Sequence, residues 1–391
     1  MHVILHIGPH KTGSSSIQSA LRKNVTSLRD QGFLTANDAE QAASALPLLF
    51  QSERAFHPRI RRQHPTWGQA QGWSEQHWVA LEQSARSLPD HTSIISSEHF
   101  SSLADPAPLI ARLRRTFDKI TVISYVRDPV DLYVSSIQQN IRGGRRLVDL
   151  HIPSDFPFGI RRQIDRYAAE VGQQNVVVRN FSRDNLVGGD IVLDFFATVS
   201  QLDRPVALAS SFVNEAFPGA VVAWLMVMNE SYERVVETDL RIELLARLDS
   251  IAELKAFPKL HLDLPDFIAA IRARTRDDCQ WLNATCLQGQ RPLHIEPPTL
   301  SAPLTAPLTA PLTTDAERLQ LRQWILQALT PEALALLLSA TIRIARPDAA
   351  AVPRRRAHKA ATAAIPDAGN RRADGPERNA APPARIAKKG Q

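Results

Sequence analysis

The sequence predicts an α/β fold, a three-layer sandwich in which helices cover both faces of a central parallel sheet. Short runs rich in β-branched residues alternate with long stretches of helical periodicity, an order typical of parallel strands joined by crossover helices. A loop with two glycines joins the first run to the first helix, an arrangement that suits anion binding. The predicted strands are Val3–Ile7, Ser93–Ser96, Ile120–Val126 and Val176–Val178.

The helices are predicted from apolar residues at helical spacing. After the first loop, Ile17, Leu21, Val25 and Leu28 share one face of a predicted helix. The region from about Gly219 to Ala273 is expected to be mostly helical. The other predicted helices are Pro108–Phe117, Val130–Ile141, Gly159–Val171 and Asp190–Val199.

Changes in composition divide the chain into four parts. Residues 1–295 form the predicted α/β domain. Within 296–314, three tandem APLT units place a Pro at every fourth position, which excludes a helix and predicts an extended linker. Two helical patterns in 315–346 predict C-terminal helices that pack back on the domain. Residues 347–391 hold almost no large apolar side chains, so this basic tail is expected to be disordered.

The positive charge of the chain is concentrated at its C-terminus. Residues 346–391 carry 11 Lys or Arg and 4 Asp or Glu, so this segment accounts for a surplus of seven positive charges against +6 for the whole chain. The rest of the chain is therefore close to neutral. A basic patch over the folded body, typical of nucleic-acid-binding proteins, is not implied, and we expect no nucleic-acid partner.

The sequence also gives expectations about membranes and metals. No apolar run approaches the roughly 18 residues of a membrane span, and the N-terminus lacks the pattern of a signal peptide. We therefore expect a cytoplasmic protein without a membrane span. The two cysteines, Cys279 and Cys286, are too few for a disulfide framework and lack the spacing of a zinc site, so no metal is expected. The oligomeric state stays open.

The stretch HIGPHKTGSSS supplies the first candidate site. It is not the P-loop of nucleoside triphosphate enzymes, because Lys11 precedes Gly13 instead of following the last glycine. Its order of residues resembles the 5′-phosphosulfate loop, itself P-loop-like, of sulfotransferases that use 3′-phosphoadenylyl sulfate (PAPS). A glycine turn with a solvated Lys is the alternative. The resemblance implies that the phosphate and sulfonate are held by Lys11, Thr12, Gly13, Ser14, Ser15 and Ser16.

A second motif follows the third predicted strand. Arg127 comes at the C-terminal edge of the sheet, where open α/β folds bind ligands, and Asp128-Pro129 predicts the start of a helix. Ser135 follows Arg127 by eight residues. The same sulfotransferase family binds the 3′-phosphate of PAPS with an Arg and a Ser at this spacing, and a guanidinium offers bidentate donors to a phosphate. A surface salt bridge between Arg127 and Asp131 is the alternative.

The resemblance covers about residues 1–200 and extends more loosely to about 290. A weaker likeness in NVVVRNFSRDNLVGGDIVLDFF places Arg179 and Arg183 beside the donor, with solvated turn residues as the alternative. Ser14-Ser15 departs from the family's commoner Thr-Thr or Thr-Ser but keeps the hydroxyls. The resemblance implies transfer of a sulfuryl group from PAPS to a hydroxyl or amine, which leaves 3′-phosphoadenosine 5′-phosphate (PAP). Lys11 would stabilise the leaving phosphate, without a metal.

An acceptor hydroxyl also needs a proton acceptor, and the second predicted strand ends in Ser-Glu-His. Glu98 stands where the resemblance places the base of the glycan-type branch. At the edge of an apolar strand its pKa should be raised toward that of a useful base. His99 is the rival candidate and His10 a third. The alternative for Glu98 is a carboxylate that caps a helix or forms a salt bridge.

The acceptor is less defined than the donor. The stretch FHPRIRRQHPTWGQAQGWSEQHW contains Arg59, Arg61, Arg62 and three Trp, and IRGGRRL follows the second motif. Aromatic and basic groups would suit a sugar or an anionic glycan, but irregular loops with solvated Arg residues are the ordinary explanation. Carbohydrate, lipid and small-molecule acceptors all stay open, with a carbohydrate as the leading candidate.

Two other classes of function compete with a sulfotransferase. A P-loop nucleotide kinase would use Asp128 as its metal-binding acid, but would need a Lys after the glycine. A non-catalytic nucleotide-binding or scaffold protein would use its basic tail to contact an acidic partner. ATP binding that requires Mg²⁺ would favour the kinase, and PAP binding without turnover would favour the scaffold.

Overall fold

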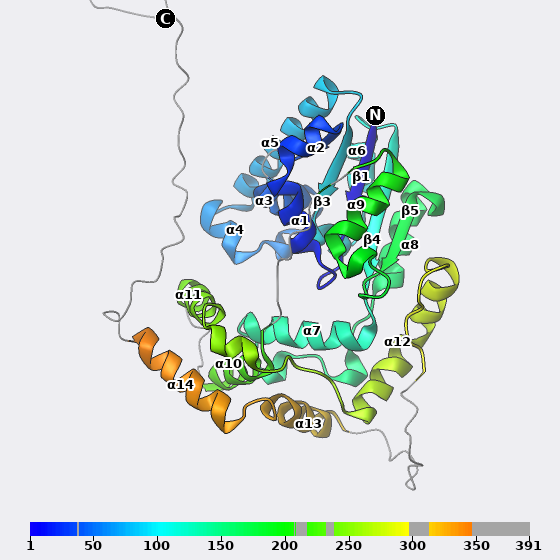
Figure 1. Ribbon diagram of the computed structural model, residues 1–391. Coiled ribbons are helices and arrows are strands. Elements are labelled where there is room, and N and C mark those ends of the chain that lie inside the picture. Colours follow the sequence, from blue (N-terminus) through cyan, green and yellow to red (C-terminus); the bar gives the residue numbers. More distant parts are fainter. Residues whose placement is uncertain (37–38, 207, 209–216, 232–237, 297–312, 346–391) are drawn as a thin grey trace, which may run out of the picture. The chain divides into compact units, whose positions relative to one another are not determined.

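The computed structural model describes residues 1–36, 39–206, 208, 217–231, 238–296 and 313–345 (Figure 1). Five parallel strands form one sheet in the order β2-β3-β1-β4-β5. Four of them correspond to predicted strands, and the three-residue β2 was not predicted because so short a run gives no clear alternation. The strands are β1 His2–His6, β2 Phe33–Thr35, β3 Thr92–Ser96, β4 Lys119–Val126 and β5 Val176–Asn180.

Alternate residues of the central strand β1 enter two separate hydrophobic cores. Val3 and Leu5 belong to one buried cluster and Ile4 to another, as the two-residue period of a strand requires. Helices α1 (Ser14–Lys23) and α9 (Ile191–Leu202) supply the core on the Ile4 face. The opposite core is supplied by α5 (Trp67–Ser87), α6 (Ala107–Leu113) and α8 (Ile160–Val171). The fold is therefore the expected three-layer α/β sandwich.

The strand order brings three chain segments to one edge of the sheet. In register, His6 of β1 lies opposite Ser96 of β3 and Ile123 of β4. Because the three strands are parallel, the segments that follow them emerge at the same C-terminal edge. The glycine loop, the Ser-Glu-His segment and Arg127 are therefore neighbours in the fold.

A helical layer lies beyond this edge (Figure 1). Helix α7 (Pro129–Arg142) begins as predicted, with the Asp128 side chain accepting a hydrogen bond from the Val130 amide. Helix α10 packs against α7, α13 and α14, and Asn229 of α10 donates to the carbonyls of Ile141 and Arg145. The layer contains α10 (Gly219–Ser231), α11 (Thr238–Asp249), α12 (Pro265–Thr285), α13 (Thr314–Leu326) and α14 (Pro331–Ala345).

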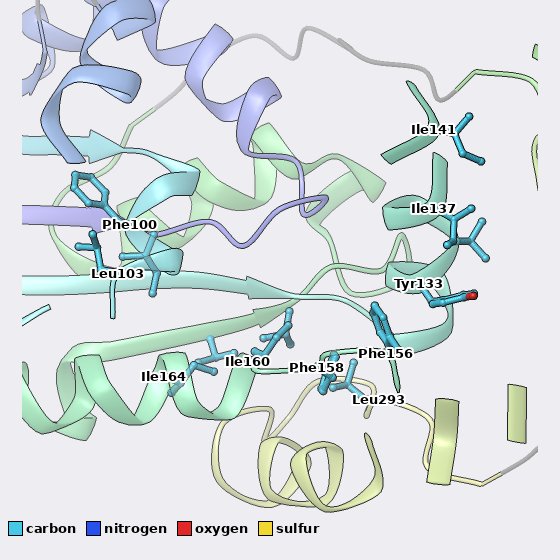
Figure 2. Packing of buried hydrophobic residues seen from close by; sticks show 14 of the residues in the cluster. Phe100, Leu103, Tyr133, Ile137, Ile141, Phe156, Phe158, Ile160, Ile164 and Leu293 are labelled. Atoms are coloured by element: carbon cyan, nitrogen blue, oxygen red, sulfur yellow. The ribbon is translucent and has the colours of Figure 1, made fainter. Parts of the chain in front are cut away.

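Apolar side chains join this layer to the sheet. Figure 2 shows Tyr133, Ile137 and Ile141 in a row along α7, at successive turns of the helix. The ring of Tyr133 meets Phe156 edge-on, with the ring centroids 5.2 Å apart. Helix α13 docks through Trp324, whose indole N–H donates to the His261 carbonyl at 3.0 Å. Most of the predicted linker 296–314 and all of the predicted tail 347–391 lie outside the described residues.

Three sequence-based expectations about helices are wrong. The segment with Arg61, Arg62 and three Trp is not a set of irregular loops, because it forms α4 (Pro58–Gln63) and α5. A capping box between Thr66 and Gln69 begins α5, and Trp78 is fully buried. The helix predicted after the first loop is interrupted at Asn24, whose side chain donates to the Ala20 carbonyl.

The break at Asn24 separates α1 from α2 (Val25–Asp30). Helix α6 also ends at Leu113, four residues before the predicted end at Phe117. The remaining α-helix is α3 (Ala39–Ala45). Short 3₁₀ turns complete the described part of the chain, and one of them, η3 (Glu98–Ser102), follows β3 directly.

Among the described helices, none is by itself long and apolar enough to cross a membrane. Helix α13 and residues Pro331–Thr341 of α14 pass the length and composition test together, but they are bent by 76°.

Candidate functional site

The loop after β1 holds a lysine in an unusual backbone conformation. Lys11 has φ 69° and is the non-glycine residue with positive φ in the described part of the chain. A side chain in this left-handed region costs about 1–2 kcal/mol, and such strain is typical of functional sites. Gly13 follows with φ 84° and begins α1, without a side-chain cap for the helix amides. The loop therefore combines a strained lysine with a helix N-terminus that has no side-chain cap.

Arg127 joins the two sequence motifs. Its Nη1 donates to the Ser135 hydroxyl at 2.7 Å and to the Lys11 carbonyl at 3.3 Å. Arg127 is therefore bonded to Ser135 and to the loop, and the described structure shows no ion pair of Arg127 with Asp131. Its guanidinium carbon also lies 5.6 Å from the centre of the Phe181 ring.

Phe181 is a site residue that the sequence analysis missed. It follows β5, and its amide donates to the Val126 carbonyl at 2.7 Å. A Cβ atom at Gly13 would lie 3.0 Å from the Phe181 ring, so glycine is also the residue that fits there. The signal in the sequence is the position of Phe181 just beyond a strand, at the edge where the other site residues emerge.

The two cations of the site are poorly compensated. Burial lowers the pKa of Lys11, the charges of Arg142 and Arg127 lower it further, and the Glu98 carboxylate opposes them. Burial also lowers the pKa of Arg127, against the opposing effects of Asp131 and Asp128. A depressed pKa means that the surroundings disfavour the positive charge. A bound anion would reverse this balance.

The hydroxyl residues of the loop have different surroundings. Thr12 is buried and donates to the Pro9 carbonyl at 2.7 Å, so it holds the loop together. Ser14 is buried and reaches the Gly8 carbonyl only at 3.4 Å, a long hydrogen bond. Ser16 is also buried, and Ser15 is exposed. Of the two loop hydroxyls for which a hydrogen bond is described, Ser14 therefore has the weaker one.

Beneath the loop lies His6, a second residue that the sequence analysis did not single out. Its Nδ1 is 2.7 Å from the Ser96 hydroxyl, and its buried Nε2 has no hydrogen-bond partner in the described structure. A Cβ atom at Gly8 would lie 2.9 Å from this Nε2 and 2.2 Å from the Ser14 hydroxyl oxygen. Glycine at position 8 therefore lets His6 and Ser14 face each other across the backbone.

The burial of His6 predicts how stability depends on pH. Desolvation lowers the pKa of His6 to about 3. The pKa of His2 is lowered to about 4, and desolvation is again the largest cause. Between pH 6.5 and these values the unfolded chain binds more protons than the folded chain, so stability falls as pH falls. For His6 alone the slope approaches ~1.4 kcal/mol per pH unit.

Urea denaturation of wild type and His6→Gln between pH 7 and pH 4 measures this effect. The variant should lose part of the slope, and an unchanged slope would show that His6 does not resist protonation in the folded state.

The base candidates gather beside Lys11. Glu98 begins η3, is partly exposed, and has its Oε1 3.9 Å from Nδ1 of His10. The rings of His10 and His99 are 6.2 Å apart. Burial lowers the pKa of His99 and so favours the neutral imidazole, an effect that the Glu98 charge opposes. Glu98 does not cap η3, since the Ser97 hydroxyl accepts the hydrogen bond from the His99 amide.

Other candidates have structural partners. Arg179 forms an ion pair with the fully buried Asp194, which also accepts a hydrogen bond from Tyr125, so Arg179 is not free to bind a donor. Arg183 is exposed on the turn after β5. Trp78 packs in the core and donates to the Leu46 carbonyl. Arg179 and Trp78 are therefore parts of the scaffold.

The conformation of Lys11 predicts an unusual effect of two substitutions on stability. Lys11→Gly should be more stable than Lys11→Ala by ~0.5–1 kcal/mol. Alanine keeps the energetic cost of a left-handed backbone, whereas glycine does not. The greater conformational entropy of glycine in the unfolded chain cancels only part of this advantage. Guanidinium denaturation of the two variants tests this. The opposite order would contradict the left-handed backbone at this position.

Comparisons with known proteins add little to this geometry. No protein-family model matches the chain, and no curated protein matches it. A similar solved chain comes from a structural characterisation of the PezAT chromosomal toxin-antitoxin system of Streptococcus pneumoniae. The two sequences are 11% identical, the match covers 63% of this chain and 87% of the other chain, and the TM-score is 0.29. A likeness at this level carries no functional argument, so the function must be inferred from the site itself.

Proposed function

We propose that the protein is a PAPS-dependent sulfotransferase that transfers a sulfuryl group to a hydroxyl or amine of an acceptor. The observation that carries the proposal is the contact of Arg127 with both Ser135 and the Lys11 carbonyl. Through it the two motifs that resemble the donor site of these enzymes meet at one place. The site combines two desolvated cations with a helix N-terminus that has no side-chain cap, which is the chemistry that binds a polyanion.

The features of the loop fit a phosphosulfate group. A Cβ atom at Gly8 would clash with His6 and Ser14, and Gly13 has a left-handed backbone. Glycine at both positions therefore allows the tight path of the loop around the helix N-terminus. Lys11 would bind the phosphate that leaves, and Arg127 with Ser135 would bind the 3′-phosphate. Thr12 would fix the loop by its bond to Pro9.

In this proposal Glu98 takes the acceptor proton. The acceptor oxygen forms a bond to sulfur, the bond from sulfur to the phosphate oxygen breaks, and the electron pair stays on PAP. Glu98 is suited to the role because it lies near Lys11 and His10, and because its side chain is not used to cap η3. His99 is the alternative base, since its neutral imidazole can also accept a proton.

The arrangement of Asp128 does not favour the kinase alternative. One carboxylate oxygen accepts a hydrogen bond from the Val130 amide, and the other accepts one from Arg272 at 2.8 Å. The side chain thus anchors α7 to α12, and a role as metal ligand would require breaking these contacts.

An acceptor screen with sulfur-labelled PAPS tests the proposal, with the full chain incubated with panels of glycans, phenols and lipid alcohols. Transfer of label that disappears in Arg127→Ala would support it. Binding of ATP with Mg²⁺, together with no binding of PAP, would contradict it and favour a kinase. Tight PAP binding with no transfer to any acceptor class would favour a nucleotide-binding scaffold.

A further inference from the structure

The C-terminal helical layer carries most of the exposed large hydrophobic side chains in the described part of the chain. In the described part of the chain, five of the eight exposed large hydrophobic residues lie on α10, α11, α13 and α14. Helix α14 contacts both α10 and α11. The five residues are Val227, Ile242, Leu319, Leu334 and Leu338.

Helix α14 is apolar on both of its faces. Ala333, Leu337 and Ala340 are buried against the body. Leu334 and Leu338, four residues apart and so on one face, are 37% and 51% exposed. A helix that is hydrophobic all round is normally buried or in contact with lipid.

The charge pattern of α14 strengthens this argument. Its charged residues are Glu332 near the start and Arg343 near the end, and the ten residues between them carry no charge. Surface helices of soluble domains usually place charged side chains on the solvent face. An uncharged exposed face such as that of α14 is therefore typical of a surface that contacts an apolar partner.

The sequence that follows α14 indicates which partner. Residues 346–391 begin directly after the helix and carry a surplus of seven positive charges, including Arg354-Arg355-Arg356. An apolar helix face next to a polybasic segment is the combination that binds anionic membrane surfaces, since either signal alone gives only weak binding. An acidic protein partner would account for the basic segment alone, and a second copy of this chain would bring a basic segment of the same charge. An anionic bilayer accounts for both the apolar face and the basic segment.

We propose that the exposed face of α14 attaches the protein to the surface of an anionic lipid bilayer, with Leu334 and Leu338 entering the interface. This peripheral attachment requires no membrane span and does not depend on the proposed enzymatic function.

Co-sedimentation of the full chain with vesicles tests the proposal. Wild type should bind vesicles of phosphatidylcholine with roughly 30% phosphatidylglycerol at least about tenfold more strongly than vesicles of phosphatidylcholine alone, and should lose this binding at high salt. Leu334→Ser with Leu338→Ser should weaken binding by about tenfold or more, as should deletion of 347–391. Val79→Ser, which changes an exposed apolar residue of α5, is the matched control and should bind as wild type does.

Three results would overturn the proposal. Wild type could fail to bind anionic vesicles. The double serine variant could bind them as well as wild type, which would show attraction by charge alone. The substitutions could convert a dimer to a monomer in analytical ultracentrifugation without changing vesicle binding, which would assign the α14 face to a second copy. Because both leucines are exposed, the melting temperature of the double variant should stay close to that of wild type and show that it folds.

Discussion

Replacing Glu98 with Gln is expected to lower turnover by ~10²–10⁴ while PAP binding is retained. The amide has nearly the same shape as the carboxylate but cannot accept the acceptor proton. The acidic limb of the pH profile of kcat should disappear with it, because that limb reports ionisation of the base. Steady-state kinetics with labelled PAPS and any acceptor found by the screen measures both effects.

Two further variants make this result specific. Glu53→Gln changes an exposed carboxylate in the short turn η2 (Glu53–Ala55) and should leave turnover unchanged. His99→Ala should have a modest effect. If His99→Ala abolished turnover while Glu98→Gln stayed active, the base would be the imidazole, and the preference for a glycan acceptor would lose its support.

Lys11→Ala is expected to have the second-largest effect, a loss of ~10²–10³ in turnover with a smaller loss of PAP affinity. Negative charge on the leaving phosphate grows as the transition state is approached, so a cation placed there stabilises the transition state more than the bound ground state. The partly buried position of Lys11 strengthens the interaction, because its charge is less screened than that of an exposed lysine.

Kinetics and calorimetry on the same preparations separate the two losses. Lys23→Ala, at the exposed end of α1, is the matched control for removing a lysine. An unchanged turnover number in Lys11→Ala would remove this residue from the mechanism. Equal losses in turnover and PAP affinity would make Lys11 a binding residue only.

The sequence predicted the parts of the fold that are strongly patterned. The runs that became β1, β3, β4 and β5 are apolar on both faces, as strands covered by helices must be. The three residues of β2 are too few to show a period. Helices α4 and α5 were mistaken for loops because the Arg residues of α4 and the Trp residues of α5 were considered as candidates for a binding surface. In the structure, Trp78 and Leu81 of α5 fill the core.

The candidate site could be predicted only where a motif carries it. Lys11, Arg127 and Ser135 were identified by their order and spacing, and the structure places Arg127 against the other two. Phe181 and His6 lie at the site because the arrangement of the strands brings them there. A local sequence pattern does not encode that arrangement. Arg179 resembled a ligand-binding residue in the sequence, but its partner, the buried Asp194, is visible only in the packed structure.

The most direct test of the whole account is titration of the protein with PAP by calorimetry, for wild type and for Arg127→Ala. The account predicts that wild type binds and that the substitution weakens binding by ~1.5–3 kcal/mol, as for loss of a charged hydrogen-bond donor. Ser135→Ala should cost less, and Arg29→Ala, an exposed arginine on α2, should cost nothing. Absence of PAP binding by folded wild type, or equal affinities for wild type and Arg127→Ala, would contradict the proposed donor site.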